Sequence, residues 1–207
     1  KQLKNPDFRI GLFESSELPL LLEYAGSYVG LQNGDTPKFV YCFWEVNEIG
    51  KTWELFQLPC ADSEFYTGRD GILRWEEGKG ELQTSELAYI KGKEAWSKKG
   101  IAIRQTRTLP ATIYNGDLYD QSSAAIVPYN ATDYFPIWTF CSSPEFHDEV
   151  RKIDKKKNVT NATLVKIPFD LSYWRRESLI RYPKGLPRAY SNSALEWVYH
   201  GHPCGAV

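Results

Sequence analysis

Residues 100–107 read Gly-Ile-Ala-Ile-Arg-Gln-Thr-Arg, and this stretch has the pattern of a β-strand. Ile101 and Ile103 alternate with residues of exposed type, which is the period of two that a β-strand shows. Short runs rich in aromatic and aliphatic residues predict further strands before and after it, at residues 38–46, 53–58, 71–75, 111–114 and 124–127. Residues 38–46 are apolar on both faces, so we expect them to form a central strand that is covered on both sides.

Helical patterns lie on either side of these strands. Apolar residues at helical spacing predict a first helix over residues 16–25. After Pro128 the pattern becomes helical again, with helices expected at residues 134–141, from the cap at Ser143 onward, and after Asp170. We therefore expect a single α+β domain over residues 1–207, with a mixed or mainly antiparallel sheet and several short helices.

The composition is that of an ordinary soluble globular protein. The 207 residues are 42% hydrophobic and 25% charged, which excludes the collagen-like, coiled-coil and disordered classes. No apolar run approaches the roughly 20 residues that span a bilayer, so we expect no membrane partner. The chain begins at Lys1 and contains no Met, which predicts a piece of a longer polypeptide.

The net charge of -1 hides an uneven distribution of charge along the chain. Residues 151–188 contain eleven Lys and Arg against three acidic residues, a net charge of +8, so the rest of the chain carries -9. Residues 91–107 form a second, smaller basic segment in which Glu94 is the one acid. Both segments are candidate contacts for the phosphates of DNA. A solvated helix face is the alternative explanation for each charge run.

The candidate DNA contacts lie in a turn-rich loop at residues 28–37, on the strand at residues 100–107 and near two helices. Amides and acids in the loop have the donors and acceptors to reach base edges, whereas cationic groups at a helix end position a protein on phosphates. The candidates are Gln32, Asn33, Asp35, Lys38, Arg104, Arg107, Lys155, Lys156, Lys157, Asn158, Arg175 and Arg176. A structural role is the alternative, because Asn-Gly-Asp is also a good turn and lysines at a helix C-terminus complement its dipole.

Three other function classes stay open from the residues alone. His200, His202 and Cys204 alternate along the chain and are a candidate metal site for a hydrolase or nuclease, although no fourth ligand is evident. A protein-interaction or scaffolding module that docks a catalytic subunit is the second alternative. A secreted domain would carry glycans, whose Asn-x-Ser/Thr acceptors occur at Asn130, Asn158 and Asn161. The motifs of serine hydrolases, phosphate-binding loops, dinucleotide folds and zinc proteases are absent from the sequence.

Four segments, in order along the chain, resemble a known family. Residues 30–39, followed by Trp44, are similar to an element that reads GLxTGDNxxF and then W, although Asn33 and Thr36 stand where Thr and Asn are more usual. Residues 125–146 resemble IVP…WAFCSSPEF, residues 159–170 resemble VTNATLVKVPFD, and residues 195–203 resemble QWLFHGHP. These elements occur in large adenine-N6 DNA methyltransferases of the type IIG restriction-modification and phage-exclusion kind, where they follow the catalytic domain.

The resemblance implies a target-recognition region in the cytoplasm of a bacterium. It implies double-stranded DNA as the ligand, and as the partner the catalytic methyltransferase domain of the same polypeptide. The Asn/Asp-Pro-Pro-Tyr/Phe signature and the Gly-rich loop for S-adenosylmethionine are absent from the sequence. We therefore expect this piece to hold no cofactor or metal and to catalyse nothing by itself, while the parent enzyme binds S-adenosylmethionine and methylates adenine.

Overall fold

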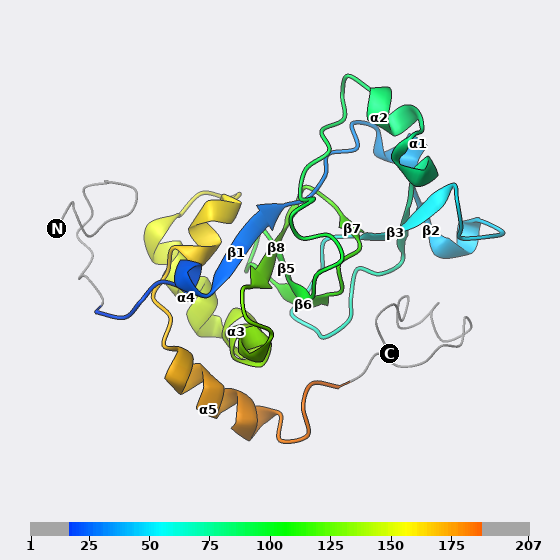
Figure 1. Ribbon diagram of the computed structural model, residues 1–207. Coiled ribbons are helices and arrows are strands. Elements are labelled where there is room, and N and C mark those ends of the chain that lie inside the picture. Colours follow the sequence, from blue (N-terminus) through cyan, green and yellow to red (C-terminus); the bar gives the residue numbers. More distant parts are fainter. Residues whose placement is uncertain (1–16, 188–207) are drawn as a thin grey trace.

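The computed structural model describes residues 17–187, which form an α+β fold with two four-stranded sheets (Figure 1). The first sheet has the strand order β1-β8-β5-β6, and all of its neighbouring strands are antiparallel. Its strands are β1 (Ala25–Val29), β5 (Gly100–Arg104), β6 (Ala111–Tyr114) and β8 (Ser123–Pro128). The expected strand at residues 100–107 is therefore confirmed in its first five residues, and it is an inner strand of this sheet.

The second sheet is mixed and has the strand order β2-β4-β3-β7. Its strands are β2 (Val40–Cys42), β3 (Trp53–Gln57), β4 (Gly71–Arg74) and β7 (Leu118–Tyr119). Strand β7 pairs with β3 in parallel, and the other two pairings are antiparallel. Two short helices lie beside this sheet, α1 (Thr36–Phe39) and α2 (Glu81–Thr84) (Figure 1).

Helices cover one face of the first sheet. They are α3 (Tyr134–Cys141), α4 (Pro144–Ile153) and α5 (Leu171–Arg181), joined by the 3-10 helix η6 (Asn161–Val165). Shorter 3-10 helices are η2 (Leu21–Glu23), η3 (Phe43–Glu45), η4 (Glu76–Gly78) and η5 (Ala131–Asp133). Ile101 and Ile103 point into the core under the helices, where Trp138 and Phe140 also lie. Asp170 caps α5 as predicted, because its Oδ1 accepts a 2.9 Å hydrogen bond from the backbone N–H of Tyr173.

The residues between the two isoleucines of β5 are buried rather than exposed. Ala102 is 1% exposed and packs in a separate cluster with Tyr114 and Tyr119 on the other face of the sheet. Tyr119, on β7, stacks edge-on against Tyr114 of β6 at 5.1 Å between ring centroids and donates a 3.0 Å hydrogen bond from its hydroxyl to the carbonyl oxygen of Tyr28. Burial raises the pKa of Tyr119, so its hydroxyl stays a donor. Tyr119 thus ties the second sheet to the first.

The segment at residues 38–46 is not a central strand. Asp35 accepts a 3.3 Å hydrogen bond from the backbone N–H of Lys38 and so caps the short helix α1, which leaves only Val40–Cys42 extended. Strand β2 is an edge strand, and Trp44 after it is 51% exposed. The apolar residues that predicted two buried faces belong to a short helix and to an edge strand. The sequence pattern alone does not distinguish this arrangement from a single buried strand.

The predicted helix at residues 16–25 is also wrong over the described residues. Only Leu21–Glu23 are helical, and β1 begins at Ala25. Ala25 lies opposite Pro128 and Val29 opposite Ala124, so pairing with β8 overrides the local helical spacing. Among residues 17–187, no helix is long and apolar enough to cross a bilayer.

Candidate nucleic-acid interface

A single arginine joins the two basic segments of the sequence. Arg151, in the last turn of α4, donates from Nη2 to the carbonyl oxygen of Arg107 at 2.8 Å. Its Nη1 donates to the carbonyl oxygens of Asp154, at 3.4 Å, and of Lys156. The turn between β5 and β6 is therefore held against the loop between α4 and η6. We call Arg107, Arg151, Lys155, Lys156 and Lys157 the basic rim.

The loop that carries the three lysines is pinned to the end of β5. Gln105, which is 6% exposed, donates from Nε2 to the carbonyl oxygen of Val159 at 2.7 Å and accepts from the backbone N–H of Val159 at 2.9 Å through its own carbonyl. Asp154 is buried and accepts a 2.9 Å hydrogen bond from the backbone N–H of Lys156. These bonds fix the backbone while the side chains of residues 155–158 stay exposed.

The exposed cations of the rim are not neutralised by carboxylates of the described residues. Within residues 17–187, neither Arg107 nor any of the three lysines forms an ion pair with a carboxylate. Arg107 has a left-handed backbone with φ of 60°, a conformation that costs a non-glycine residue about 1 kcal/mol. The bond from Arg151 to its carbonyl oxygen holds it there. The result is an exposed group of like charges on a fixed backbone, which suits a polyanion.

Arg104 lies beside the rim but points inward. Its Nε donates to the Thr106 hydroxyl oxygen at 3.1 Å and its Nη1 to the carbonyl oxygen of Cys60 at 3.3 Å. The side chain is half-buried, so part of the guanidinium already has partners inside the protein. The predicted row of donors on this strand is therefore broken: Gln105 is internal, Arg104 is partly internal, and Arg107 is exposed in the turn.

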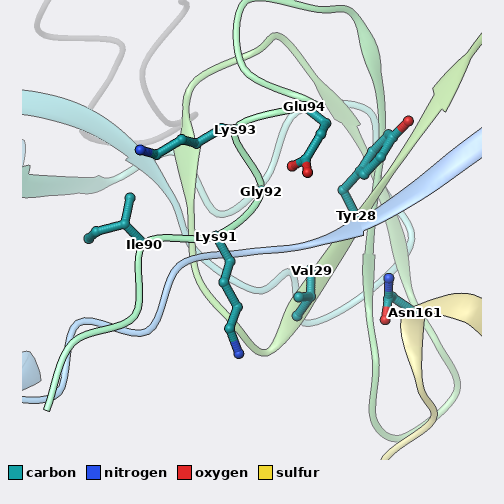
Figure 2. A pocket seen from close by; sticks show the side chains of 8 residues that line it. All are labelled: Tyr28, Val29, Ile90, Lys91, Gly92, Lys93, Glu94 and Asn161. Atoms are coloured by element: carbon teal, nitrogen blue, oxygen red, sulfur yellow. The ribbon is translucent and has the colours of Figure 1, made fainter.

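An open hollow of about 370 Å³ lies beside β1 (Figure 2). Its lining comes from β1, from the segment before β5 and from η6, and consists of Tyr28, Val29, Ile90, Lys91, Gly92, Lys93, Glu94 and Asn161. Asn161 donates from Nδ2 to the carbonyl oxygen of Ser27 at 2.8 Å. Residues 159–161 thus run from the end of β5 to β1. Lys91 and Lys93 therefore line the same hollow as Asn161, which follows the rim lysines by four residues.

A tight turn at Gly92, between the two lysines of the hollow, lies against the strands. Gly92 has a φ of 79°, and a Cβ there would lie 2.5 Å from the hydroxyl oxygen of Tyr119 and 2.7 Å from the carbonyl oxygen of Val29. Only glycine fits this position without strain. Figure 2 shows the Lys91 and Lys93 side chains leaving the turn on different sides and the Glu94 carboxylate near Tyr28. Glu94 keeps the hollow itself from being a purely cationic pocket.

The loop at residues 32–38 is ordered by its own side chains. Asn33 is 5% exposed, and its Oδ1 accepts a 3.2 Å hydrogen bond from the Thr36 hydroxyl. Gln32 donates from Nε2 to the carbonyl oxygen of Leu87 at 3.3 Å. Lys38 contacts the carboxylate of Glu81, and this contact lowers the pKa of Glu81. The loop is thus a folded turn in which Asp35 has an exposed side chain and also caps α1.

Arg175 and Arg176 lie at the other end of the first sheet. Arg175 donates from Nη2 to Asp133 Oδ1 at 2.8 Å, and Asp133 follows Pro128, the last residue of β8. Arg104 lies opposite Ser123, the first residue of β8, about 17 Å away along that strand. In Figure 1, α5 lies at the bottom, far from α1 and α2 at the upper right. The structure therefore brings Arg107 and residues 155–158 together and separates them from the α5 arginines.

The candidate metal ligands His200, His202 and Cys204 lie outside the described residues. Within residues 17–187, no group of three His, Cys, Asp or Glu side chains is placed to hold a metal ion. In the sequence, Arg151 is only one member of a charge run. The position of Arg151 in the last helical turn was the available signal, but its partner, 44 residues earlier, was not predictable.

No protein-family model matches the chain, and no curated protein matches it. Among solved structures, it is similar to the HsdS subunit from Thermoanaerobacter tengcongensis, with a TM-score of 0.42 and 15% sequence identity. The match covers 86% of this chain and 40% of the HsdS chain. The chain thus spans less than half the length of that subunit, and a likeness at this level does not identify a family.

Proposed function

We propose that this chain is a sequence-specific DNA-recognition module, the target-recognition part of an adenine-specific DNA methyltransferase or fused restriction-modification enzyme. The basic rim is the observation that carries the proposal. In a chain of net charge -1, two segments that are 44 residues apart meet so that Arg107 and Lys155, Lys156 and Lys157 form one exposed cationic surface. Such a surface attracts the phosphates of duplex DNA through charge and counterion release.

The segments that resemble the methyltransferase family supply the scaffold of this surface. Ile137, Trp138, Phe140 and Phe146 come from one such segment, and all are buried in the core under the helices. The segment at residues 159–170 supplies further buried residues and also begins at Val159, the residue that Gln105 holds. The family-like residues therefore build the frame on which exposed residues of the rim and loops are presented.

The roles divide by chemistry. Lys155, Lys156, Lys157 and Asn158 would position the protein on phosphates, whereas the exposed polar groups of the loop at residues 32–38 would approach bases. The catalytic domain of the same polypeptide would bind S-adenosylmethionine and extrude the target adenine from the duplex. This chain would bind the DNA and select the target sequence.

The test is the salt dependence of duplex binding, measured by fluorescence anisotropy with a labelled duplex between about 50 and 200 mM salt. Lys155→Ala, Lys156→Ala and Lys157→Ala combined should weaken binding and flatten the slope of log K against log salt by up to about 2.7. The control removes the same charge elsewhere, by Lys51→Ala, Lys79→Ala and Lys184→Ala combined. Equal losses in both triple variants, or no salt-dependent binding by the wild type and by its full-length parent, would contradict the proposal.

One observation favours a second role, as a docking module for the catalytic domain. Leu179 and Ile180 on α5 are 66% and 71% exposed, beside the exposed Arg176. Exposed aliphatic residues of this size favour contact with protein rather than phosphate. In the full-length enzyme, Leu179→Ser with Ile180→Ser should increase amide hydrogen exchange in α5 and leave the affinity for DNA unchanged. Unchanged exchange would leave α5 with no role in docking.

A further inference from the structure

Two large, exposed apolar side chains come shortly before the lysines of the hollow along the chain. Leu87 is 65% exposed and Tyr89 is 55% exposed, although large apolar side chains are usually buried. We propose that Tyr89, with Leu87 beside it, contacts the bases of duplex DNA and that Lys91 contacts the neighbouring phosphate. This inference rests on the proposed function, because it names residues through which a DNA-recognition module would touch bases.

The position of Tyr89 is fixed by Gln32. The backbone N–H of Gln32 donates to the carbonyl oxygen of Tyr89 at 3.0 Å, and the N–H of Tyr89 donates back to the carbonyl oxygen of Gln32 at 2.9 Å. The Gln32 side chain adds a third bond, to the carbonyl oxygen of Leu87. Three hydrogen bonds between two segments leave the Tyr89 ring on a backbone that does not need to order on binding.

The two segments also approach closely at Gly34. Its φ is 76°, and a Cβ there would lie 2.7 Å from the Leu87 Cβ and 2.7 Å from the Leu87 carbonyl oxygen. The glycine lets the loop at residues 32–38 lie directly against Leu87. Leu87 and Tyr89 are thus presented outward by a rigid support, and they are not the tip of a loose loop.

A cation lies against the Tyr89 ring. The Lys91 Nζ is 5.3 Å from the centre of the ring, and Lys91 has no carboxylate partner among residues 17–187. An aromatic ring paired with a free ammonium is the combination that proteins use to stack on a base and hold the adjoining phosphate. Leucine side chains serve in the same way as apolar wedges against base steps.

The place of Tyr89 in the fold connects it to the basic rim. Lys91 lines the hollow together with Val29 and Asn161, and the segment that ends at Asn161 begins beside the rim lysines (Figure 2). Residues 159–161 thus link the loop that carries the rim lysines to the hollow that Lys91 lines. The carboxylate of Glu94 lies within the hollow, so we assign the phosphate to the exposed Lys91 ammonium and not to the centre of the hollow.

This assignment changes the role expected of Gln32. The sequence predicts that its amide reads a base edge, but the amide nitrogen is bonded to Leu87. Gln32 is then a positioning residue that acts through Tyr89 and Leu87. Its effect on DNA binding should disappear once Leu87 and Tyr89 are both removed, whereas a residue that touches a base directly would act independently.

The experiment compares Tyr89→Ala with Tyr129→Ala in binding a duplex that contains the fluorescent base 2-aminopurine. Tyr129 is the matched control, because it is 63% exposed and follows the far end of β8. Tyr89→Ala should lower affinity by about tenfold or more and abolish the change in 2-aminopurine fluorescence. Tyr89→Phe should retain both, because it keeps the ring, and Tyr129→Ala should retain both as well.

Two further variants separate the roles within the group. Lys91→Ala should flatten the salt slope by about 0.9, which Tyr89→Ala should leave unchanged. Gln32→Ala should reduce the 2-aminopurine response without changing the melting temperature, and it should add nothing in a background that carries both Leu87→Ala and Tyr89→Ala.

The outcomes distinguish this inference from the proposed function. If the wild type binds duplex DNA with a salt-dependent affinity but Tyr89→Ala behaves like Tyr129→Ala, the inference is wrong and the DNA-recognition function stands. If the wild type and its full-length parent bind no DNA, the proposed function is wrong and this inference falls with it.

Discussion

The guanidinium of Arg151 donates a 2.8 Å hydrogen bond to the carbonyl oxygen of Arg107, and this contact gathers cationic groups that repel one another. Arg151 also bonds to the carbonyl oxygens of Asp154 and Lys156, so a charged side chain satisfies three backbone acceptors of two loops. The repulsion between Arg107 and the lysines at residues 155–157 is opposed by these bonds and by the pairing of Gln105 with Val159. The cationic surface therefore depends on specific hydrogen bonds between two loops and not only on the run of three lysines.

Replacing Arg151 should affect both stability and DNA binding. Arg151→Ala removes hydrogen bonds to a charged donor and is expected to lower the free energy of unfolding by about 1–3 kcal/mol, as measured by urea denaturation. DNA affinity should fall further than the loss of one charge predicts, because the rim backbone loosens. Arg176→Ala is the control, since Arg176 is exposed. Equal stability of Arg151→Ala and the wild type would show that the hydrogen bonds of Arg151 do not stabilise the two loops.

The α5 arginines should separate into a structural and a surface residue. Asp133 has a side chain that is 8% exposed and pairs with Arg175, so Arg175→Ala leaves a nearly buried carboxylate without its partner. Because Arg175 itself is half-exposed, we expect a loss of about 1 kcal/mol in the free energy of unfolding. Arg176→Ala should cost little. A double-mutant cycle with Asp133→Asn measures the coupling, and a coupling near zero would mean that the pair does not stabilise the helical layer.

Gly92 and Gly50 form a matched pair for testing the turn beside the hollow. Gly92→Ala places a methyl group 2.5 Å from the Tyr119 hydroxyl at a φ of 79°, and we expect it to lower the free energy of unfolding by about 1–3 kcal/mol. At Gly50 the nearest atom to a new Cβ is 3.6 Å away, so Gly50→Ala should change stability by about 0.5 kcal/mol or less. Thermal melting compares the two variants, and Gly92→Ala should have the lower melting temperature. Similar melting temperatures would contradict the close packing of the turn.

The thiols should differ in reactivity. Burial raises the pKa of Cys60 to about 11, and it also raises the pKa of the fully buried Cys141. At pH 8 the Cys60 thiolate is then only about a thousandth of the population, and the thiolate is the reactive form. Among the three cysteines within residues 17–187, iodoacetamide should modify half-exposed Cys42 first and leave Cys60 and Cys141 unmodified until the protein unfolds. Mass spectrometry of the labelled peptides checks the order, and early labelling of Cys60 would contradict its burial.

Elements with strong local signals were predictable from the sequence. Ile101 and Ile103 identify β5, and Asp170 identifies the start of α5 through its cap. Residues 38–46 were not predictable in the same way, because Asp35 caps a short helix inside a pattern that also fits a strand. Residues 25–29 became a strand because β8 offers an edge to pair with, which is a relationship between distant parts of the chain.

The candidate site was predictable in its charges and not in its geometry. Lys155, Lys156 and Lys157 are exposed, as a run of charge at a helix end predicts. Asn33 and Gln32 were expected to face DNA, but one is buried against Thr36 and the other holds Leu87. Short polar side chains in turns bond to nearby backbone as readily as to a ligand, so a sequence alone does not separate the two.

Lysine footprinting tests whether the basic rim is the surface that binds DNA. The protein is treated with an acetylating reagent, with and without a saturating duplex at low salt, and the modified lysines are identified by mass spectrometry. Bound DNA should protect Lys91, Lys155, Lys156 and Lys157, while Lys51, Lys79 and Lys184 stay reactive. Protection of Lys184 with residues 155–157 still reactive would place DNA on the α5 side and contradict the basic rim as the binding surface.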